Sequence, residues 1–168
     1  MDLSPSNRQI TSNGINIHLA EAGNPEGELL LFMHGFPEFW YGWKHQISFF
    51  SQKGYRVVAP DQRGYNLTDK PKRISDYNLD TLAADMVGVI DESGREKATL
   101  IAHYWGGAVA WWIGMKYPER INKLVILNVA HPIVMRSNIK SNKVQRRKSW
   151  YMFFFQSFSK KFVNKQIF

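Results

Sequence analysis

The chain has 168 residues, of which 44% are hydrophobic and 14% aromatic, so it is long enough for one domain with a sizeable core. It contains no cysteine, which excludes disulfides, thiolate metal sites and a cysteine nucleophile. The net charge of +8 is unevenly spread: residues 1–135 hold 13 Lys and Arg against 14 Asp and Glu, whereas residues 136–168 hold 9 and none. A basic tail on a nearly neutral body is not typical of nucleic-acid-binding proteins, so no nucleic-acid partner is expected.

The first residues, MDLSPSNRQITSNG, lack the charged segment and the apolar run of an export signal. No apolar run approaches the roughly 18 residues that a membrane-spanning helix needs. We therefore expect a cytoplasmic protein.

Apolar runs alternate with helical patterns along the chain. The predicted strands are 15–20, 29–33, 55–59, 98–102 and 123–127, and the predicted helices are 40–52, 79–91 and 105–116. Runs such as LLLFM and LVIL are apolar throughout, as in strands that a parallel sheet buries on both faces. The expected fold is a doubly wound, mostly parallel α/β sheet that opens with an antiparallel hairpin. The polar segment 61–78 is predicted to be an ordered surface loop.

The first candidate site is the turn after the predicted strand 29–33, because ligands of open α/β sheets bind beyond the carboxyl ends of the strands. The strand ends in His34 and Gly35, and Pro37 follows two residues later. The glycine permits a tight turn that is expected to point the Phe36 N–H into a cleft, where it could stabilise an oxyanion. The alternative is an ordinary strand-to-helix loop.

The second candidate site is the turn AHYWGG at 102–107. A small residue two positions before the centre and glycines after it are what a sharp strand–turn–helix elbow requires. Here Tyr104 is the central residue, Gly106 and Gly107 follow it, and the Trp105 N–H is expected to point toward the same place as that of Phe36. The alternative is a helix start with incidental glycines.

From about Gly14 to Gln156 the chain resembles the α/β-hydrolase superfamily and, within it, the soluble epoxide hydrolases. The resemblance rests on HGFPEFWYGWKHQI, YRVVAPDQRGYNLTDKP, AHYWGG, YPERINKLVILN and WYMFFFQ. It implies an α/β-hydrolase fold in which an elbow aspartate attacks an epoxide, backbone N–H groups act as oxyanion-type donors, and cap tyrosines hold the epoxide oxygen. Those roles fall on Tyr104 for the nucleophile position, on Phe36 and Trp105 for the backbone donors, and on Tyr151 for the first cap tyrosine.

The resemblance further implies a small apolar substrate, no cofactor and no metal. His34 and His103 flank the two turns, but no acid or cysteine completes a ligand set around them, so we interpret them as packing and hydrogen-bonding residues. Residues 1–134 correspond to the first part of the hydrolase core, truncated before the last strands. Residues 135–168 are either the beginning of the helical cap or an aberrant basic tail.

The nucleophile position departs from the family pattern. An aspartate is ionised at neutral pH, whereas only about one phenol in a thousand is, because the ordinary pKa of a phenol is about 10. Tyr104 either reacts beside a base, as tyrosine does in some glycosidases, or fills the cleft without reacting, which we prefer. After it the only acid is Glu119 and the only histidine His131, and Asn128 could orient a histidine but supplies no charge.

Three functions follow as hypotheses. The first is an epoxide-hydrolase relative that is catalytically impaired; the others are a non-catalytic protein that binds a small apolar ligand, and one half of an enzyme whose second half is encoded separately. In the tail, aromatic residues recur every four positions among lysines, at Trp150, Phe154, Phe158 and Phe162. This stripe fits a cap helix, which is preferred, or a helix on an anionic membrane surface.

Overall fold

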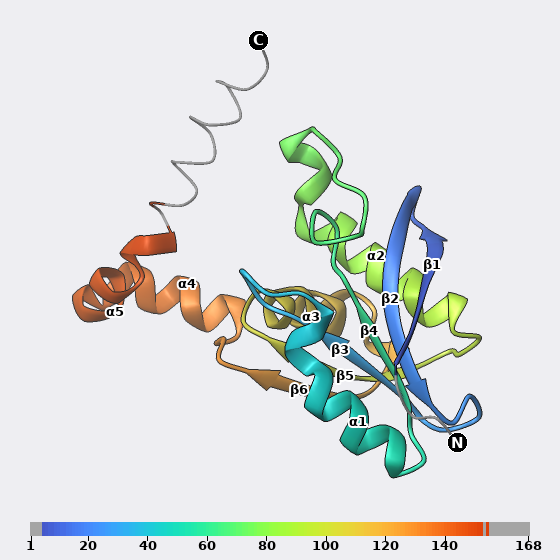
Figure 1. The fold of residues 1–168 in the computed structure, drawn as a ribbon. Coiled ribbons are helices and arrows are strands. Elements are labelled where there is room, and N and C mark those ends of the chain that lie inside the picture. The colour runs from blue at the N-terminus through green and yellow to red at the C-terminus, as the bar shows by residue number, and fades with distance from the viewer. Residues whose placement is uncertain (1–4, 153, 155–168) are drawn as a thin grey trace. The chain divides into compact units, whose positions relative to one another are not determined.

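The structure, a computed structural model, describes residues 5–152 and 154 (Figure 1). Six strands form one sheet in the order β1-β2-β4-β3-β5-β6. Their bounds are β1 Ser6–Ser12, β2 Ile15–Gly23, β3 Leu29–Met33, β4 Arg56–Pro60, β5 Ala98–His103 and β6 Ile121–Leu127. β2 pairs antiparallel with β1 and β4, whereas β4, β3, β5 and β6 run parallel to one another. The predicted doubly wound, mostly parallel sheet with an opening hairpin is therefore confirmed.

The hairpin turn follows from its two residues. Asn13 and Gly14 link β1 to β2, with φ values of 47° and 76°. A two-residue turn with positive φ at both positions matches the right-handed twist of the flanking strands, and Asn-Gly adopts it most readily. The first strand of the hairpin was not among the predicted strands, because SNRQITS carries few apolar residues.

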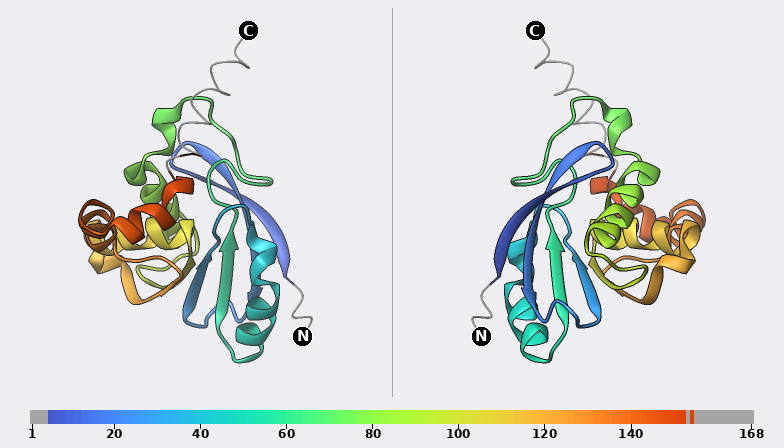
Figure 2. Two further views of the ribbon diagram at one scale, coloured as in Figure 1. Left: turned by 90° about the vertical axis from the view of Figure 1, so that its left-hand side faces the viewer. Right: turned by 90° about the vertical axis from the view of Figure 1, so that its right-hand side faces the viewer.

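Helices cover both faces of the sheet (Figure 2). The bounds are η1 Trp40–Trp43, α1 Lys44–Gln52, η2 Ile74–Tyr77, α2 Leu79–Glu92, α3 Trp105–Lys116 and η3 Pro118–Arg120. All five residues of β3 are buried. Leu29, Leu31 and Met33 pack in the core that α2 and α3 share, while Leu30 and Phe32 pack in the core under η1 and α1. This alternation is why LLLFM is apolar at every position.

The predicted helix 40–52 is instead a 3₁₀ turn, η1, followed by α1. The predicted helix 79–91 is α2, one residue longer. It is capped by Asn78, whose side-chain oxygen accepts a hydrogen bond from the Thr81 N–H at 2.9 Å. An asparagine cap satisfies a backbone donor that the first turn leaves unpaired.

The prediction of a surface loop over 61–78 is wrong for its first part. Asp61, Gln62, Arg63 and Thr68 are at most 5% exposed. The Arg63 guanidinium donates two hydrogen bonds of 2.7 Å to the carboxylate of Asp85 on α2, which is also fully buried. Polar residues are stable in the interior when each finds such a partner, and no local pattern of residues predicted these partners.

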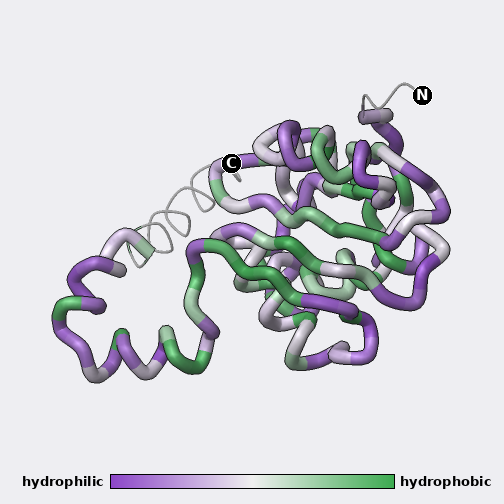
Figure 3. The backbone as a smooth tube through the Cα atoms, turned by 90° about the horizontal axis from the view of Figure 1, so that it is seen from below, coloured by the Kyte–Doolittle hydropathy of each residue, from purple (hydrophilic) through white to green (hydrophobic). Residues whose placement is uncertain are grey.

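The chain divides into two compact units, residues 1–129 and 130–168. The described part of the second unit holds α4 Pro132–Ser141 and α5 Lys143–Lys148. Figure 3 shows hydrophobic and hydrophilic residues alternating along these helices. Trp150 and Phe154 of the predicted stripe are exposed with ring centroids 5.6 Å apart, and Phe158 and Phe162 lie outside the described residues. The assignment of 1–134 and 135–168 to core and cap stays a prediction.

β6 forms one side of the sheet and pairs only with β5 among the described strands. Val125 and Leu127 on this strand are 43% and 40% exposed. Within the described residues, no helix is both long enough and apolar enough to cross a membrane.

Candidate active site

The elbow forms where β5 ends at His103 and α3 begins at Trp105. Tyr104 between them has φ 49° and ψ −106°, a conformation that residues with a side chain rarely adopt. Its N–H donates to the Leu127 carbonyl at 2.9 Å, and its carbonyl accepts from the Ala108 N–H at 3.1 Å. These bonds to β6 and to the first turn of α3 hold the strained residue in place.

The two glycines of the elbow lie where neighbouring atoms leave no room for a Cβ. A Cβ on Gly106 would lie 2.5 Å from the carbonyl oxygens of both Met33 and His34, and one on Gly107 would lie 2.5 Å from Cγ1 of Val129. The Gly106 N–H donates to the His34 carbonyl at 3.0 Å. The elbow therefore packs directly against the turn that follows β3, as the order of the two motifs predicted.

The first turn meets the elbow at Gly35. A Cβ there would lie 3.0 Å from both Nδ1 of His103 and Cβ of Tyr104. The next peptide bond, between Phe36 and Pro37, is cis. Phe36 and Trp105 are 51% and 36% exposed, so both side chains lie at the surface. The oxyanion role of the two backbone N–H groups stays a prediction.

His34 supports the first turn from inside. Its side chain is fully buried; Nδ1 donates to the Gly35 carbonyl at 2.8 Å, and Nε2 accepts from the Gln62 N–H at 3.0 Å. Burial lowers the pKa of His34, since the interior disfavours the charged ring. A neutral ring with the proton on Nδ1 satisfies both bonds.

A polar cluster beside the elbow contains a residue that the sequence did not single out, Glu38. Its Oε2 lies 3.2 Å from Nδ1 of His103, and the Asn128 amide nitrogen lies 3.2 Å from Nε2 of the same ring. Asn128 has φ 60° and directly follows β6. The prediction that Asn128 can orient a histidine is confirmed, and the histidine is His103. The only sign of Glu38 was its place in HGFPE.

This cluster borders a hollow of about 210 Å³, which we call the elbow pocket. It is lined by Glu38, Gly42, Trp43, Gln46, His103, Leu127 and Asn128. Trp43 and Leu127 supply apolar surface, and the amide, carboxylate and imidazole groups supply hydrogen-bonding positions. The arrangement suits a small ligand with one apolar part and one or two polar atoms.

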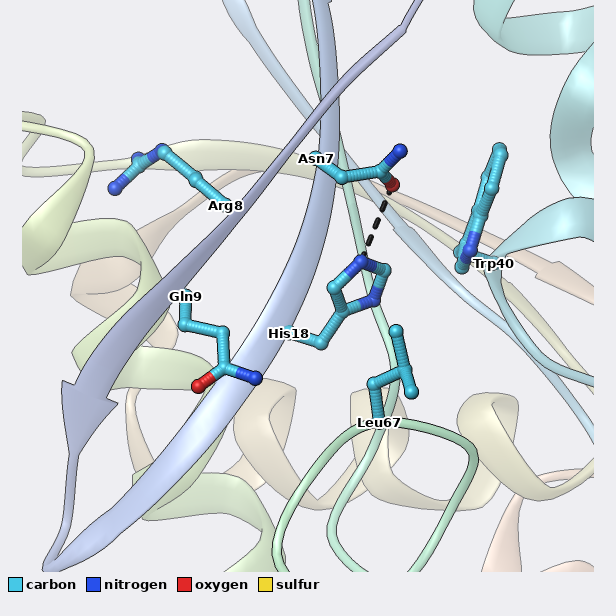
Figure 4. Close-up of a pocket in the computed structure, with 6 residues that line it drawn as sticks. All are labelled: Asn7, Arg8, Gln9, His18, Trp40 and Leu67. Atoms are coloured by element: carbon cyan, nitrogen blue, oxygen red, sulfur yellow. Dashed lines mark hydrogen bonds between the residues drawn. The ribbon is translucent and has the colours of Figure 1, made fainter.

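A second hollow, of about 430 Å³, shares no lining residue with the elbow pocket. Figure 4 shows Asn7, His18, Trp40 and Leu67 around it. Nδ1 of His18 donates to the buried carboxylate of Asp61 at 2.7 Å, and Nε2 lies 3.1 Å from the Asn7 side-chain oxygen. These contacts tie β1 and β2 to the segment after β4. This hollow is larger than the elbow pocket, but none of the elbow residues 102–107 lines it.

Three candidates remain: Glu119 in the first unit, and His131 and Tyr151 in the second. Glu119 lies in η3, after the twelve residues of α3, so about 18 Å of helix separates it from Tyr104. His131 caps α4, where its ring accepts from the Ile133 N–H at 3.3 Å. Tyr151, also in the second unit, is partly buried. In the described part of the chain, no three His, Asp or Glu side chains are grouped as a metal site would need.

Comparison with known families decides the classification. The family described as alpha/beta hydrolase fold matches residues 28–166. The chain belongs to this family. Among curated relatives, the hydrolase is 50% identical over 147 residues to the AB hydrolase superfamily protein YfhM of Bacillus subtilis and 46% identical over 150 residues to epoxide hydrolase 1 of Caenorhabditis elegans. These alignments cover 88% and 89% of this chain but 51% and 37% of the relatives, so the chain spans about half of their length or less.

Solved structures of epoxide hydrolases support the same classification. A mutant epoxide hydrolase from Bacillus megaterium, in complex with its product 3-[1]naphthyloxy-propane-1,2-diol, matches with a TM-score of 0.83 and 42% identity over 89% of this chain and 51% of that one. Epoxide hydrolase A from Mycobacterium thermoresistibile matches with a TM-score of 0.73 and 42% identity over 75% of this chain and 40% of that one. This α/β hydrolase is therefore related to epoxide hydrolases.

Proposed function

We propose that this α/β hydrolase binds a small apolar epoxide or the corresponding diol at its elbow, and that Tyr104 makes it a poor catalyst. The observation that carries the proposal is the conformation of Tyr104, which occupies the position of a nucleophile at φ 49° on a strand-to-helix elbow. Its kinship with epoxide hydrolases supports the class of ligand. The elbow pocket, which is lined by His103 beside Tyr104 but not by Tyr104 itself, combines apolar and polar walls and supports binding of such a molecule next to the elbow.

The reason for weak catalysis is chemical. When a carboxylate opens an epoxide, one of its oxygens forms a bond to an epoxide carbon while the ring carbon–oxygen bond breaks, and the released alkoxide oxygen takes a proton from water. A neutral phenol is a much weaker nucleophile than a carboxylate. Glu119 does not replace the missing carboxylate, because it lies beyond the far end of α3.

The experiment compares the protein with Tyr104→Asp and Tyr104→Asn variants. The probe is 1-naphthyl glycidyl ether, the epoxide that corresponds to the diol bound by the Bacillus megaterium enzyme. We expect no diol from the unmodified protein and a covalent ester in the Tyr104→Asp variant, detected as an added mass of one epoxide. The asparagine of the Tyr104→Asn variant has nearly the same shape as aspartate but no nucleophilic carboxylate, so this variant should gain no mass.

Binding is measured separately, by the rise in thermal unfolding temperature with the diol. A rise in all three proteins supports the ligand class. Rapid turnover by the unmodified protein would show that catalysis is not impaired, and no stabilisation together with no adduct in any protein would refute the proposed ligand.

A second candidate is that the chain acts with a separate polypeptide that supplies an acid and a histidine. The exposure of Val125 and Leu127 on β6 favours it, because an apolar strand with an unpaired side readily accepts another strand. Addition of the C-terminal half of YfhM to the Tyr104→Asp variant should then convert the trapped ester into released diol. Persistence of the ester would count against this candidate.

A further inference from the structure

The second unit carries a surface that the proposed function does not use. Residues 130–168 contain 9 Lys and Arg and no Asp or Glu. Six of these cations lie in the described part, and all six are exposed. They are Arg136, Lys140, Lys143, Arg146, Arg147 and Lys148. We call them the basic group.

Large apolar side chains are exposed among these cations. Ile133 is 68% exposed, Val144 63% and Trp150 61%, and Val134 and Phe154 are 52% and 47% exposed. Exposed apolar residues of this size, gathered in one short segment, indicate an interaction surface.

On α4 the spacing places two cations beside an exposed apolar residue. Arg136 and Lys140 lie three and seven positions after Ile133 on α4, so the three residues share one face of the helix. Beyond it, Arg146 lies in α5 and Trp150 follows the turn at Ser149, and both side chains are exposed. At a membrane interface, long Lys and Arg side chains reach the headgroups while neighbouring Trp, Phe and aliphatic side chains enter the acyl boundary.

We propose that the segment 130–154 docks on an anionic lipid surface, with the basic group against the headgroups and Trp150 at the boundary of the acyl chains. Charge complementarity selects an anionic partner, since no acid within the unit offsets the six exposed cations. The apolar residues select lipid over nucleic acid, because Ile133, Val134 and Val144 would gain no burial against phosphates. Trp is the residue type enriched at this depth of a membrane.

The sequence alone favoured a cap helix for this segment. The simultaneous exposure of the cations and the apolar residues is what only the structure supplies. The proposal does not rest on the proposed function, since no residue of the elbow takes part.

The test is cosedimentation of the full chain with vesicles of phosphatidylcholine alone or with one third phosphatidylserine. Binding to the anionic vesicles should be at least about tenfold tighter and should weaken in high salt. The Lys140→Glu/Arg146→Glu variant should bind them more than about tenfold less tightly, since each cation near such a surface contributes about fivefold. Trp150→Ala should also weaken binding.

The matched control is Lys72→Glu/Lys97→Glu, which changes the net charge equally on exposed lysines of the first unit and should bind like the unmodified protein. Equal loss in both double variants would show a nonspecific effect of net charge and overturn the proposal. Equal binding to neutral and anionic vesicles would also overturn it. So would displacement of the protein from anionic vesicles by a single-stranded oligonucleotide, if Trp150→Ala at the same time had no effect on binding.

Discussion

Glu38 and His103 are 65 residues apart in the chain, and Oε2 of the first lies 3.2 Å from Nδ1 of the second. The carboxylate only accepts hydrogen bonds, so Nδ1 carries a proton. On the other side of the ring, the Asn128 amide lies 3.2 Å from Nε2 and can donate to it. The ring is therefore held from both sides immediately before the strained Tyr104.

We expect Glu38→Ala to lower the free energy of unfolding by about 1 kcal/mol or less, because the pair is partly exposed to solvent. Glu38→Gln should cost less, since its amide oxygen still accepts from Nδ1. Urea unfolding measures both, and Glu92→Ala, at an exposed position, serves as the control. A loss as large from the control as from Glu38→Ala would contradict a specific role for this contact.

The strain at Tyr104 predicts a difference between two variants that both remove its side chain. Tyr104→Gly should be more stable than Tyr104→Ala by about 1–2 kcal/mol, because glycine adopts a positive φ without a steric cost. The same pair of substitutions at Trp105, which lies in α3, should favour alanine instead. Thermal or urea unfolding of the four variants checks the prediction, which fails if alanine is preferred at both positions.

Gly106→Ala should destabilise the fold by about 3 kcal/mol or more, since the new Cβ would lie 2.5 Å from two backbone oxygens that cannot move independently. The control is Gly42→Ala, where the nearest atoms are 3.8 Å away on the flexible side chain of Glu38. That variant should change stability by only about 0.5 kcal/mol. Equal effects at the two glycines would mean that the elbow does not pack against the first turn as described.

His34 predicts a dependence of stability on pH. Its pKa is lowered by burial, so between that value and the ordinary 6.5 the unfolded chain binds more protons than the folded one. The stability from the neutral ring is thus complete above about pH 6.5 and is lost as the pH falls. His34→Gln should be less stable at pH 8 and should show a smaller decline toward pH 5 than the unmodified protein. If the free energies of unfolding of the two proteins declined equally from pH 8 to pH 5, His34 would not be the source of the pH dependence.

Much of the fold could be predicted because it depends on local patterns. LLLFM and LVIL indicated buried strands, and HGFP and AHYWGG indicated turns whose glycines permit close approach, so the element order and the meeting of two turns followed from the sequence. The absence of cysteine and the concentration of positive charge after residue 135 were equally visible.

The partners of the polar residues could not be predicted, because they depend on which distant segments the sheet order brings together. Glu38 reaches His103 because β3 and β5 are neighbours in the sheet, so the turns that follow them lie side by side. The segment after β4 is buried because Arg63 finds Asp85 on α2. A charged residue has the same local pattern at the surface and in a buried pair, and only the tertiary structure decides between them, since it alone determines whether a partner replaces water.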